Sequence, residues 1–338
     1  MTKNKTRATS HDVAKLAGVS QTAVSLVFSG RAGSRVSPAT TARIRHAAKE
    51  LGYAPDLNAA RLKSGHVKVL GLAVPTVMQP LYSSVFLAVE RRARDLGYSV
   101  ILMNSGNYVD WVGRLTEMLR SNQLGGAVVF APQLEEVKAL SRAGLPILYS
   151  DVPGMDVPSA NFDIEGGMRL AADHLLALGH RRFAYLGVST RRATFQKRLD
   201  AFANYLEAHG GSISVIARAD GFAFDDAFVA ASTLLESVSL FTAVACDDDL
   251  LAPAVIRAAL DRGMTIPRDF SLVAVANIEL ARMLTPSLTT VSLPVEAFSE
   301  RVVGSLVDQI EGGSAPDGFN IPTELVVRES TGRVPRSR

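Results

Sequence analysis

A stripe of four side chains near the start of the chain combines hydrogen-bonding groups with helical spacing. Gln21, Thr22, Ser25 and Leu26 fall at i, i+1, i+4 and i+5, which places them on one side of a helix. Gln and Thr side chains can hydrogen-bond the base edges in the major groove of B-DNA, and the groove admits an α-helix. The stripe is therefore a candidate reader of DNA sequence. The alternative is the solvated face of an ordinary helical domain.

The elements that must hold this stripe are three short helices. Thr9 and Asp12 have the spacing of a capping box, and Gly18 ends the first helix, whose apolar face is predicted to hold Val13, Leu16 and Ala17. Ser20 can cap the second helix, which turns Val24, Val27 and Phe28 toward a core. Ser37 and Pro38 begin the third helix, which ends at Gly52. Two helices joined by a three-residue turn are typical of a helix-turn-helix.

The charge of the chain is divided unevenly along its 338 residues. Residues 1–68 contain 12 Lys or Arg and 3 Asp or Glu, a net charge of +9, whereas the remainder carries a net charge of −6. A basic module on a mildly acidic body favours binding to a phosphate backbone through one end only. The alternative is a solvated basic face.

Cysteine usage and hydropathy indicate the compartment. Cys246 is the single cysteine, so no intrachain disulfide requires an oxidising environment. The first residues lack the apolar core of an export signal, and no run of about 18 apolar residues occurs. We expect a soluble, cytoplasmic protein that does not enter a membrane.

From Val67 onward, short β-branched runs alternate with stretches of helical length. The predicted strands fall in two series: 67–74, 98–103, 126–130 and 146–149, then 182–187, 212–217, 241–246 and 271–275. Such alternation predicts parallel sheets wound by right-handed crossovers, and two series predict two lobes. A ligand is then expected at the carboxyl ends of the strands, in a cleft between the lobes.

Several motifs in order resemble the lactose-repressor (LacI/GalR) family of bacterial transcription regulators. They are ATSHDVAKLAGVSQTAVSLV, VSPATTARIRHAAKELGYAP, and AARLKSG followed by VKVLGLAVP. The resemblance implies an all-α helix-turn-helix headpiece (1–54), a hinge helix (55–66), and an α/β core (67–338) like a periplasmic sugar-binding protein, with two parallel, doubly wound sheets. Lobe 1 is expected at about 67–158 and 293–320, and lobe 2 at about 159–290 and 321–332.

The hinge helix implied by the resemblance has its own DNA contacts. Ala59 and Leu62 lie on one side of it, and the paired Leu62 side chains of a dimer are expected to wedge open a base step in the minor groove. The family often has Ala-Arg-x-Leu here, whereas this chain has Ala-Ala-Arg-Leu, so Arg61 is displaced by one position. The alternative for Leu62 is a packing residue in a linker.

The resemblance also implies an effector site in the cleft. Arg198 occupies the position of an effector-contacting arginine, and its guanidinium could bind sugar hydroxyls, a carboxylate or a phosphate. Asp249 matches an acceptor aspartate, although a helix-capping role is the alternative. Further matches are Asp151, Phe222 as a stacking ring, and Arg192 with Thr194, which resemble a purine-responsive pattern; loop, core or solvated positions remain open for these residues.

Some residues depart from the family pattern. The usual Gly-Phe/Tyr-Asp-Asp is replaced by Ala274-Val275-Ala276-Asn277, so two carboxylates are lost and the effector is not expected to bind as an ordinary sugar does. No phosphate loop, dinucleotide fingerprint, nucleophile elbow or zinc-protease motif occurs, so we predict no catalysis and no cofactor. No metal site is predicted either, since nothing completes a coordination sphere around the consecutive aspartates.

Together these observations predict a transcription regulator, a repressor, that binds a pseudo-palindromic double-stranded DNA operator and is controlled by a sugar or sugar derivative. The short segment after Ser330 favours a homodimer over a tetramer. Two alternatives stay open. One is a small-molecule binding module with no transcriptional role, and the other is a regulator that responds to a purine, a nucleoside or a phosphosugar.

Overall fold

The computed structural model describes residues 8–28, 33–53, 67–106, 109–152, 154–190 and 192–334. The chain divides into two compact units, Met1–Val67 and Lys68–Arg338. The predicted hinge helix, including Ala59 and Leu62, lies outside the described residues. Among the described residues, no helix is both long and apolar enough to cross a bilayer.

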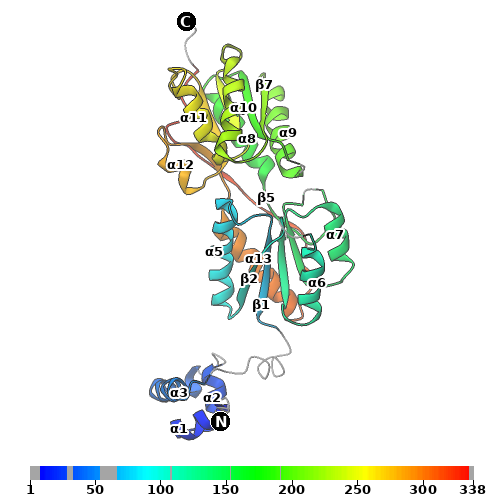
Figure 1. Cartoon of the computed structure of the whole chain (residues 1–338), viewed down its shortest axis with the longest axis vertical. Helices are drawn as coiled ribbons and strands as arrows, with labels where there is room; N and C mark the ends of the chain where they lie inside the picture. The colour runs from blue at the N-terminus through cyan, green and yellow to red at the C-terminus, as the bar shows by residue number, and fades with distance from the viewer. Residues whose placement is uncertain are drawn as a thin grey trace, which may run out of the picture. The chain divides into compact units, whose positions relative to one another are not determined.

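The first unit is a three-helix headpiece (Figure 1). Its helices are α1 (Ser10–Ala17), α2 (Gln21–Phe28) and α3 (Pro38–Glu50). Each helix contributes a completely buried side chain to a single apolar cluster: Val13 from α1, Val24 from α2 and Ile44 from α3. Tyr53 closes this cluster by an edge-on contact with Phe28 at 5.6 Å between ring centroids. The headpiece therefore has a core of its own.

The predicted helix ends are confirmed. The Thr9 hydroxyl accepts from the backbone N–H of Asp12, whose carboxylate accepts in return from the N–H of Thr9 at 2.8 Å. Gly18 ends α1 in the left-handed conformation with a φ of 63°, which glycine adopts at no steric cost. The prediction that Leu16 faces the core is wrong, because it is 47% exposed. Ala14 is buried instead, since the buried face of α1 is centred on Val13 and Ala17.

The second unit begins with a sheet of four parallel strands in the order β2-β1-β3-β4. These are β1 (Val69–Val74), β2 (Ser99–Asn104), β3 (Gly126–Phe130) and β4 (Ile147–Ser150). Side chains that alternate along the strands pack on opposite faces. One face is covered by α5 (Pro80–Asp95) and α13 (Val295–Ile310), and the other by α6 (Trp111–Arg120) and α7 (Leu134–Ser141).

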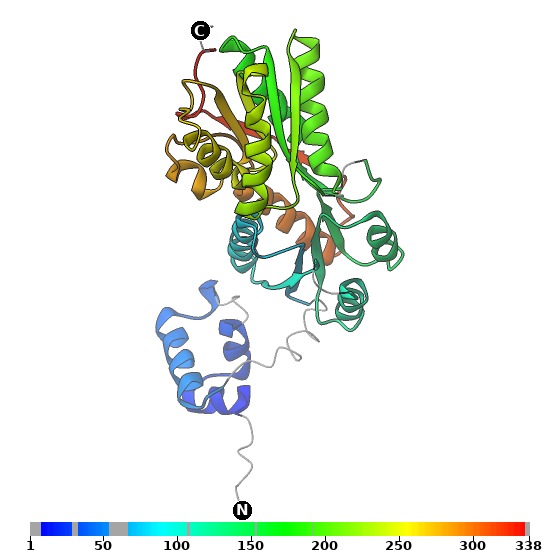
Figure 2. The same ribbon diagram turned by 45° about the horizontal axis from the view of Figure 1, so that its top comes forward.

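A larger sheet of six strands forms the other lobe, in the order β12-β10-β9-β8-β6-β7. Its strands are β6 (Arg182–Val188), β7 (Ser212–Ala219), β8 (Ala243–Cys246), β9 (Ser271–Ala276), β10 (Thr289–Ser292) and β12 (Glu324–Val326). The helices α8 (Ile164–Ala177) and α9 (Ala193–Ala208) cover one face, and α10 (Phe224–Glu236) and α11 (Ala252–Leu260) the other (Figure 2). The expectation of a wholly parallel sheet needs one correction, because β12 runs antiparallel to β10.

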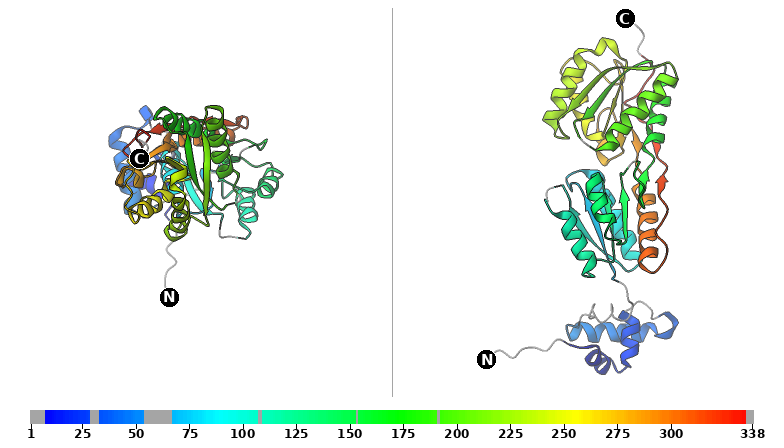
Figure 3. Two further views of the ribbon diagram at one scale, coloured as in Figure 1. Left: turned by 90° about the horizontal axis from the view of Figure 1, so that it is seen from above. Right: turned by 90° about the vertical axis from the view of Figure 1, so that its right-hand side faces the viewer.

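The two lobes are joined by chain segments that run side by side. The parallel strands β5 (Ala160–Phe162) and β11 (Phe319–Ile321) pair where the chain passes between lobes (Figure 3). A third segment, Leu293 and Pro294, connects β10 directly to α13. The residues that follow β4 and β8 both contact α9: Asp151 accepts from Thr194, and the Asp247 carbonyl accepts from Arg198.

Candidate functional site

The exposed face of α2 holds the four residues of the predicted stripe. Gln21 and Thr22 are exposed, and Ser25 and Leu26 are half-buried. Leu26 also packs against the apolar cluster of the headpiece. The first turn of α2 is thus the part of the stripe that is open to a partner, while Val24 and Val27 fix the helix from behind.

The side chain of Gln21 is oriented by the preceding helix. Its Nε2 donates a hydrogen bond to the Ser10 hydroxyl at 2.7 Å, which links the starts of α1 and α2. A glutamine amide has two N–H donors and a carbonyl acceptor, so one donor and the acceptor remain for a base edge. The contact limits the rotation of Gln21 before any DNA is bound.

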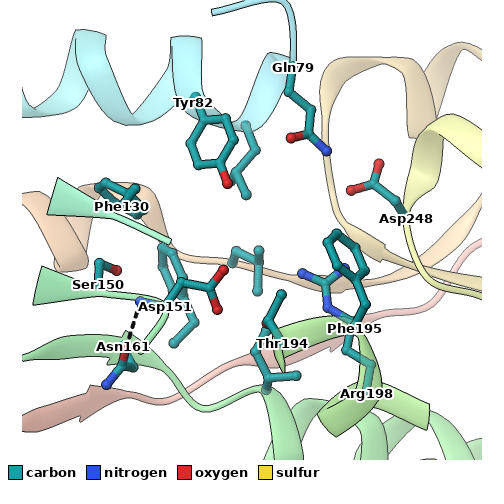
Figure 4. Close-up of a pocket in the computed structure, with 14 residues that line it drawn as sticks. Gln79, Tyr82, Phe130, Ser150, Asp151, Asn161, Thr194, Phe195, Arg198 and Asp248 are labelled. Carbon is teal, nitrogen blue, oxygen red and sulfur yellow. Dashed lines mark hydrogen bonds between the residues drawn. The ribbon is translucent and has the colours of Figure 1, made fainter. Parts of the chain in front are cut away.

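A small cavity lies between the two lobes, at the carboxyl ends of their strands (Figure 4). Its volume is about 50 Å³, which is far below the roughly 300 to 1,000 Å³ of a typical ligand pocket. Lobe 1 contributes the start of α5 and the ends of β3 and β4, and lobe 2 contributes the start of α9 and the end of β8. The lining residues are Gln79, Leu81, Tyr82, Phe130, Ser150, Asp151, Asn161, Phe162, Ile164, Thr194, Phe195, Arg198, Asp248 and Leu293.

Arg198 is buried in the first half of α9 and reaches the cavity with its guanidinium. Only 4% of its surface is exposed. Its Nη1 donates to the carbonyl of Asp247, and the guanidinium lies over the ring of Phe195 at 4.8 Å from the centroid. Its Nε has no hydrogen-bond partner among the described residues. A buried N–H without a partner is costly, so this donor is available to a bound molecule.

Asp151 follows β4 and is held at the cavity by its backbone. Its N–H donates to the Asn161 side-chain oxygen at 2.7 Å, and its φ of 60° lies in the left-handed region. Burial raises the pKa of Asp151, while a hydrogen bond from Thr194 and the charges of Arg198 and Arg192 lower it in part. Asp151 and Thr194 belong to different lobes, so this bond connects the two sides of the cleft.

The three consecutive aspartates after β8 have three different environments. Asp247 accepts from the Tyr185 hydroxyl at 2.5 Å and from the N–H of Val188 at 2.8 Å, and burial raises its pKa. Asp248 lines the cavity, and its carboxylate accepts only the N–H of Leu250, at 3.0 Å, from the described residues. Burial raises the pKa of Asp248 to about 7, and the charge of Arg198 opposes the rise.

The structure does not place Asp249 at the cavity, contrary to our expectation. Its two carboxylate oxygens accept from the Thr290 hydroxyl at 2.6 Å and from the N–H of Ile278 at 2.9 Å. Burial raises its pKa to about 6, and these two bonds oppose the rise. Asp249 therefore joins the end of β8 to β10, and Asp248 takes the position that we expected for it. No three His, Cys, Asp or Glu side chains gather as a metal site among the residues with described positions.

Two other candidate residues differ in their relation to the cavity. Arg192 lies at its edge, where Nη1 donates to the Tyr82 hydroxyl of the opposite lobe at 3.4 Å. Phe222 does not line the cavity; it packs against Phe195 at 5.7 Å between ring centroids, within the apolar cluster of lobe 2. Phe222 therefore supports the wall that carries Phe195.

The sequence did not single out several cavity residues. Ser150 precedes Asp151 at a strand end, so the strand-end rule alone could have found it. Gln79 and Tyr82 lie at the start of α5, whose sequence pattern is that of an ordinary core helix. Asn161 affects the cavity indirectly, because its side-chain oxygen accepts from the backbone N–H of Asp151. For these three residues the sequence holds no local signal.

The headpiece, the two lobes and the cavity between them define a helix-turn-helix regulator with a ligand-binding core. Residues 9–56 match the model of bacterial regulatory proteins of the lacI family, and residues 172–331 match a periplasmic binding protein-like domain. The transcriptional repressor PurR of Mannheimia succiniciproducens is 31% identical over 338 residues, covering 97% of this chain and 99% of PurR.

Two solved structures extend this similarity to the whole fold. A lac repressor dimer bound to operator and the anti-inducer ONPF has a TM-score of 0.80 and 26% identity, covering 96% of this chain and 99% of that one. A complex of the transcriptional regulator CelR with cellobiose has a TM-score of 0.70 and 28% identity, covering 96% of this chain and all of that one. This chain belongs to the lacI family of bacterial regulatory proteins, which confirms the predicted fold class and the prediction of a transcription regulator.

Proposed function

We propose that this chain represses transcription as a homodimer that binds a pseudo-palindromic operator and is controlled by a small-molecule effector. The observation that carries the proposal is a headpiece with its own core, in which the first turn of α2 is exposed beside the buried Val24. The similarity to a lac repressor dimer bound to operator also supports DNA binding by a dimer of this chain.

In this proposal α2 lies in the major groove. Gln21 presents an N–H donor and its carbonyl oxygen to one base, and Thr22 and Ser25 present hydroxyls. Leu26, half-buried, offers an apolar contact to a thymine methyl group. The basic residues of the headpiece contact phosphates, which supply affinity and no sequence preference. Contacts of Ala59 and Leu62 in the minor groove remain a prediction that rests on the family resemblance.

The effector binds between the lobes and is a sugar or sugar derivative. Arg198, Asp151 and Asp248 are its polar contacts, Thr194 and Arg192 lie beside them, and the similarity to a cellobiose-bound regulator supports this class. A cavity of about 50 Å³ has room for a few water molecules but not for a sugar, so the lobes must separate to admit one. Opening breaks the Arg192–Tyr82 and Thr194–Asp151 contacts. The effector then shifts the balance between lobe arrangements, and with it the operator affinity of a cytoplasmic dimer.

The test is operator binding by the full-length protein. Fluorescence anisotropy with DNA from upstream of its own gene, compared with scrambled DNA, measures the sequence preference. Gln21→Ala is expected to cost about 1 to 3 kcal/mol at one symmetric pair of base positions. Glu50→Ala, at the exposed end of α3, is the matched control and is expected to leave the preference unchanged. Equal affinity for both DNAs would favour the alternative of a binding module with no transcriptional role.

A further inference from the structure

The cavity between the lobes has an excess of buried negative charge. Asp151, Asp248 and Arg198 are its charged lining residues, two carboxylates against one guanidinium. The negative charge of Asp151 is opposed by two cations, Arg198 and the half-exposed Arg192. Asp248 has one cation nearby, Arg198, and two further carboxylates, Asp247 and Asp249. Asp248 is only 3% exposed. It is therefore the lining carboxylate with the least cationic compensation among the described residues.

The neighbouring aspartates do not share this property. Asp247 and Asp249 each accept two hydrogen bonds from the protein, and Asp249 also has the charge of Arg328 nearby. Asp248 accepts one backbone N–H, and Figure 4 shows its carboxylate facing the same space as the Asp151 carboxylate and the Tyr82 hydroxyl. The described residues give Asp248 no second hydrogen bond, although the Gln79 amide lies near its carboxylate in Figure 4, so a molecule in this space can supply a further donor.

Unpartnered polar atoms at the cavity give independent evidence for a ligand. Four buried side-chain N or O atoms have no partner among the described residues, and two of them, Ser150 Oγ and Arg198 Nε, belong to lining residues. Ser150 is 1% exposed, and its hydroxyl points toward the cavity in Figure 4. Orphan buried groups of this kind are rare in folded proteins. Arg198 Nε requires an oxygen acceptor, and Ser150 fits a hydroxyl or an ether oxygen.

The apolar walls suit the same kind of molecule. The rings of Tyr82, Phe130 and Phe162 line the cavity, and Tyr82 and Phe130 meet edge to face at 5.7 Å between centroids. Aromatic faces attract ammonium groups and also pack against the C–H faces of a sugar ring. A phosphate or carboxylate ligand, by contrast, would add negative charge beside Asp151 and Asp248.

We propose that the effector is a small polyhydroxylated amine of the amino-sugar class, whose ammonium group binds Asp248 and whose oxygens meet Arg198 Nε and Ser150 Oγ. This inference rests on the proposed function and names the chemistry of its effector. The ammonium supplies the missing donors and the missing positive charge together. A neutral sugar of the same shape leaves the Asp248 charge uncompensated.

The titration of Asp248 gives the proposal a pH signature. Burial raises its pKa to about 7, against the opposing charge of Arg198 from α9 and with Asp247 and Asp249 in its own turn and Tyr82 from α5 nearby. An ammonium ligand binds the ionised form. Between pH 6 and pH 8 the ionised fraction rises from about a tenth to about nine tenths, so the affinity for a cation rises about tenfold.

The experiment compares matched probes on the full-length protein. Glucosamine, galactosamine and mannosamine are each tested against the parent hexose by thermal shift and calorimetry, and methylammonium chloride is tested against sodium chloride at equal ionic strength. At least one amine is expected to bind about tenfold or more tightly than its parent, and methylammonium, which stays protonated throughout, is expected to gain affinity from pH 6 to pH 8. If no amine raises the Tm above its parent or the salt baseline, the proposal is overturned.

Variants separate a ligand contact from a structural carboxylate. Asp248→Asn is expected to abolish the preference for amines and to raise the ligand-free Tm at pH 8, because a buried charge is removed. Asp249→Asn, the matched control from the same turn, is expected to lower the Tm and keep the preference. Ser150→Ala is a second variant, expected to weaken amine and hexose alike. A preference that survives Asp248→Asn contradicts the proposal.

The outcome also distinguishes this inference from the proposed function. If neutral hexoses alone change operator binding, the regulator assignment stands and the amine assignment is wrong. If the protein binds its amine but shows no sequence-selective DNA binding, the site chemistry stands and the proposed function is wrong.

Discussion

Replacement of Arg198 by Met removes a buried cation while keeping the length of the side chain. Arg198 is 4% exposed, donates to the Asp247 carbonyl and lowers the pKa of both Asp151 and Asp248. At pH 8 the variant leaves two buried carboxylates without their nearest buried cation, and breaking such a pair costs about 3 to 5 kcal/mol. At pH 5.5 Asp248 is largely protonated in either protein. The part of the cost that comes from Asp248 then disappears, and the lost hydrogen bond to the Asp247 carbonyl, about 1 to 3 kcal/mol, remains together with the part from Asp151.

The sign of this pH dependence follows from proton binding. The pKa of Asp248 is raised in the folded protein, to about 7, so the folded state holds a proton that the unfolded state has lost between roughly pH 4 and pH 7. Stability therefore decreases as pH rises through that window. Loss of Arg198 raises the folded pKa of Asp248 further, which deepens the decrease and extends it upward in pH.

Urea unfolding followed by circular dichroism at pH 5.5 and pH 8 measures the difference. We expect the free energy of unfolding lost by Arg198→Met to be about 2 kcal/mol larger at pH 8. Arg257→Met is the control, because its ion pair with Asp261 is exposed on α11 and contributes less than about 1 kcal/mol. A loss that is equal at both pH values, or larger at pH 5.5, would refute the assignment of Arg198 as the counter-charge of Asp248.

Three further predictions concern the headpiece and the cavity wall. Operator affinity should fall by about 0.9 log units per log unit of salt for each phosphate neutralised, and a flat salt titration would contradict a phosphate-binding headpiece. Val24→Ala should cost about 2 kcal/mol and lower the headpiece Tm, because Val24 is completely buried in a small core; an unchanged melting curve in circular dichroism would speak against that core. Phe222→Leu should leave effector affinity in calorimetry within about twofold, because Phe222 packs behind Phe195; a tenfold loss would make it a direct contact.

The helix ends and the long strands could be predicted because their signals are local. A capping box at Thr9, a glycine at residue 18 and the Ser37–Pro38 pair each act within one turn of a helix, and the structure has all three. The strands from β1 to β4 carry continuous apolar runs, which are typical of sheets buried on both faces. The buried face of α1 was harder to predict. Ala14 and Leu16 flank the same apolar stripe, and which of them is buried depends on how the helix packs against its neighbours.

The segments that join the lobes could not be predicted in detail. β5, β11 and β12 have three residues each, too few to establish an alternating pattern, and β12 pairs antiparallel with β10 through contacts distant in sequence. β5 and β11 pair although they lie far apart in the chain, so neither strand has a local signal of its partner. Such strands follow from the tertiary fold rather than from their own residues.

In the cavity, too, the sequence does not predict which individual residue contributes the side chain. Three consecutive aspartates after β8 predict a polar strand end. The conformation of the turn that follows determines which of the three faces the cleft. A short 3₁₀ helix at Asp249–Leu251 directs Asp249 toward Thr290 and leaves Asp248 beside Arg198. The residue type was predictable from the sequence, and the residue number was not.

The departure at Ala276–Asn277 places a neutral amide where the family pattern has a carboxylate, outside the cavity lining. Both residues have positive φ, 126° and 54°, and Asn277 is held by its neighbours: Nδ2 donates to Ser292 Oγ at 3.1 Å, and Oδ1 accepts from Arg328 at 2.6 Å. Both ends of the amide are thus satisfied, and Asn277 does not line the cavity. An aspartate at residue 277 would keep an acceptor for Arg328 but lose the N–H that donates to Ser292 Oγ. It would also add negative charge near Asp249, whose pKa burial already raises. The neutral amide adds no charge to that strand end, and the carboxylates that line the cavity are those of Asp151 and Asp248.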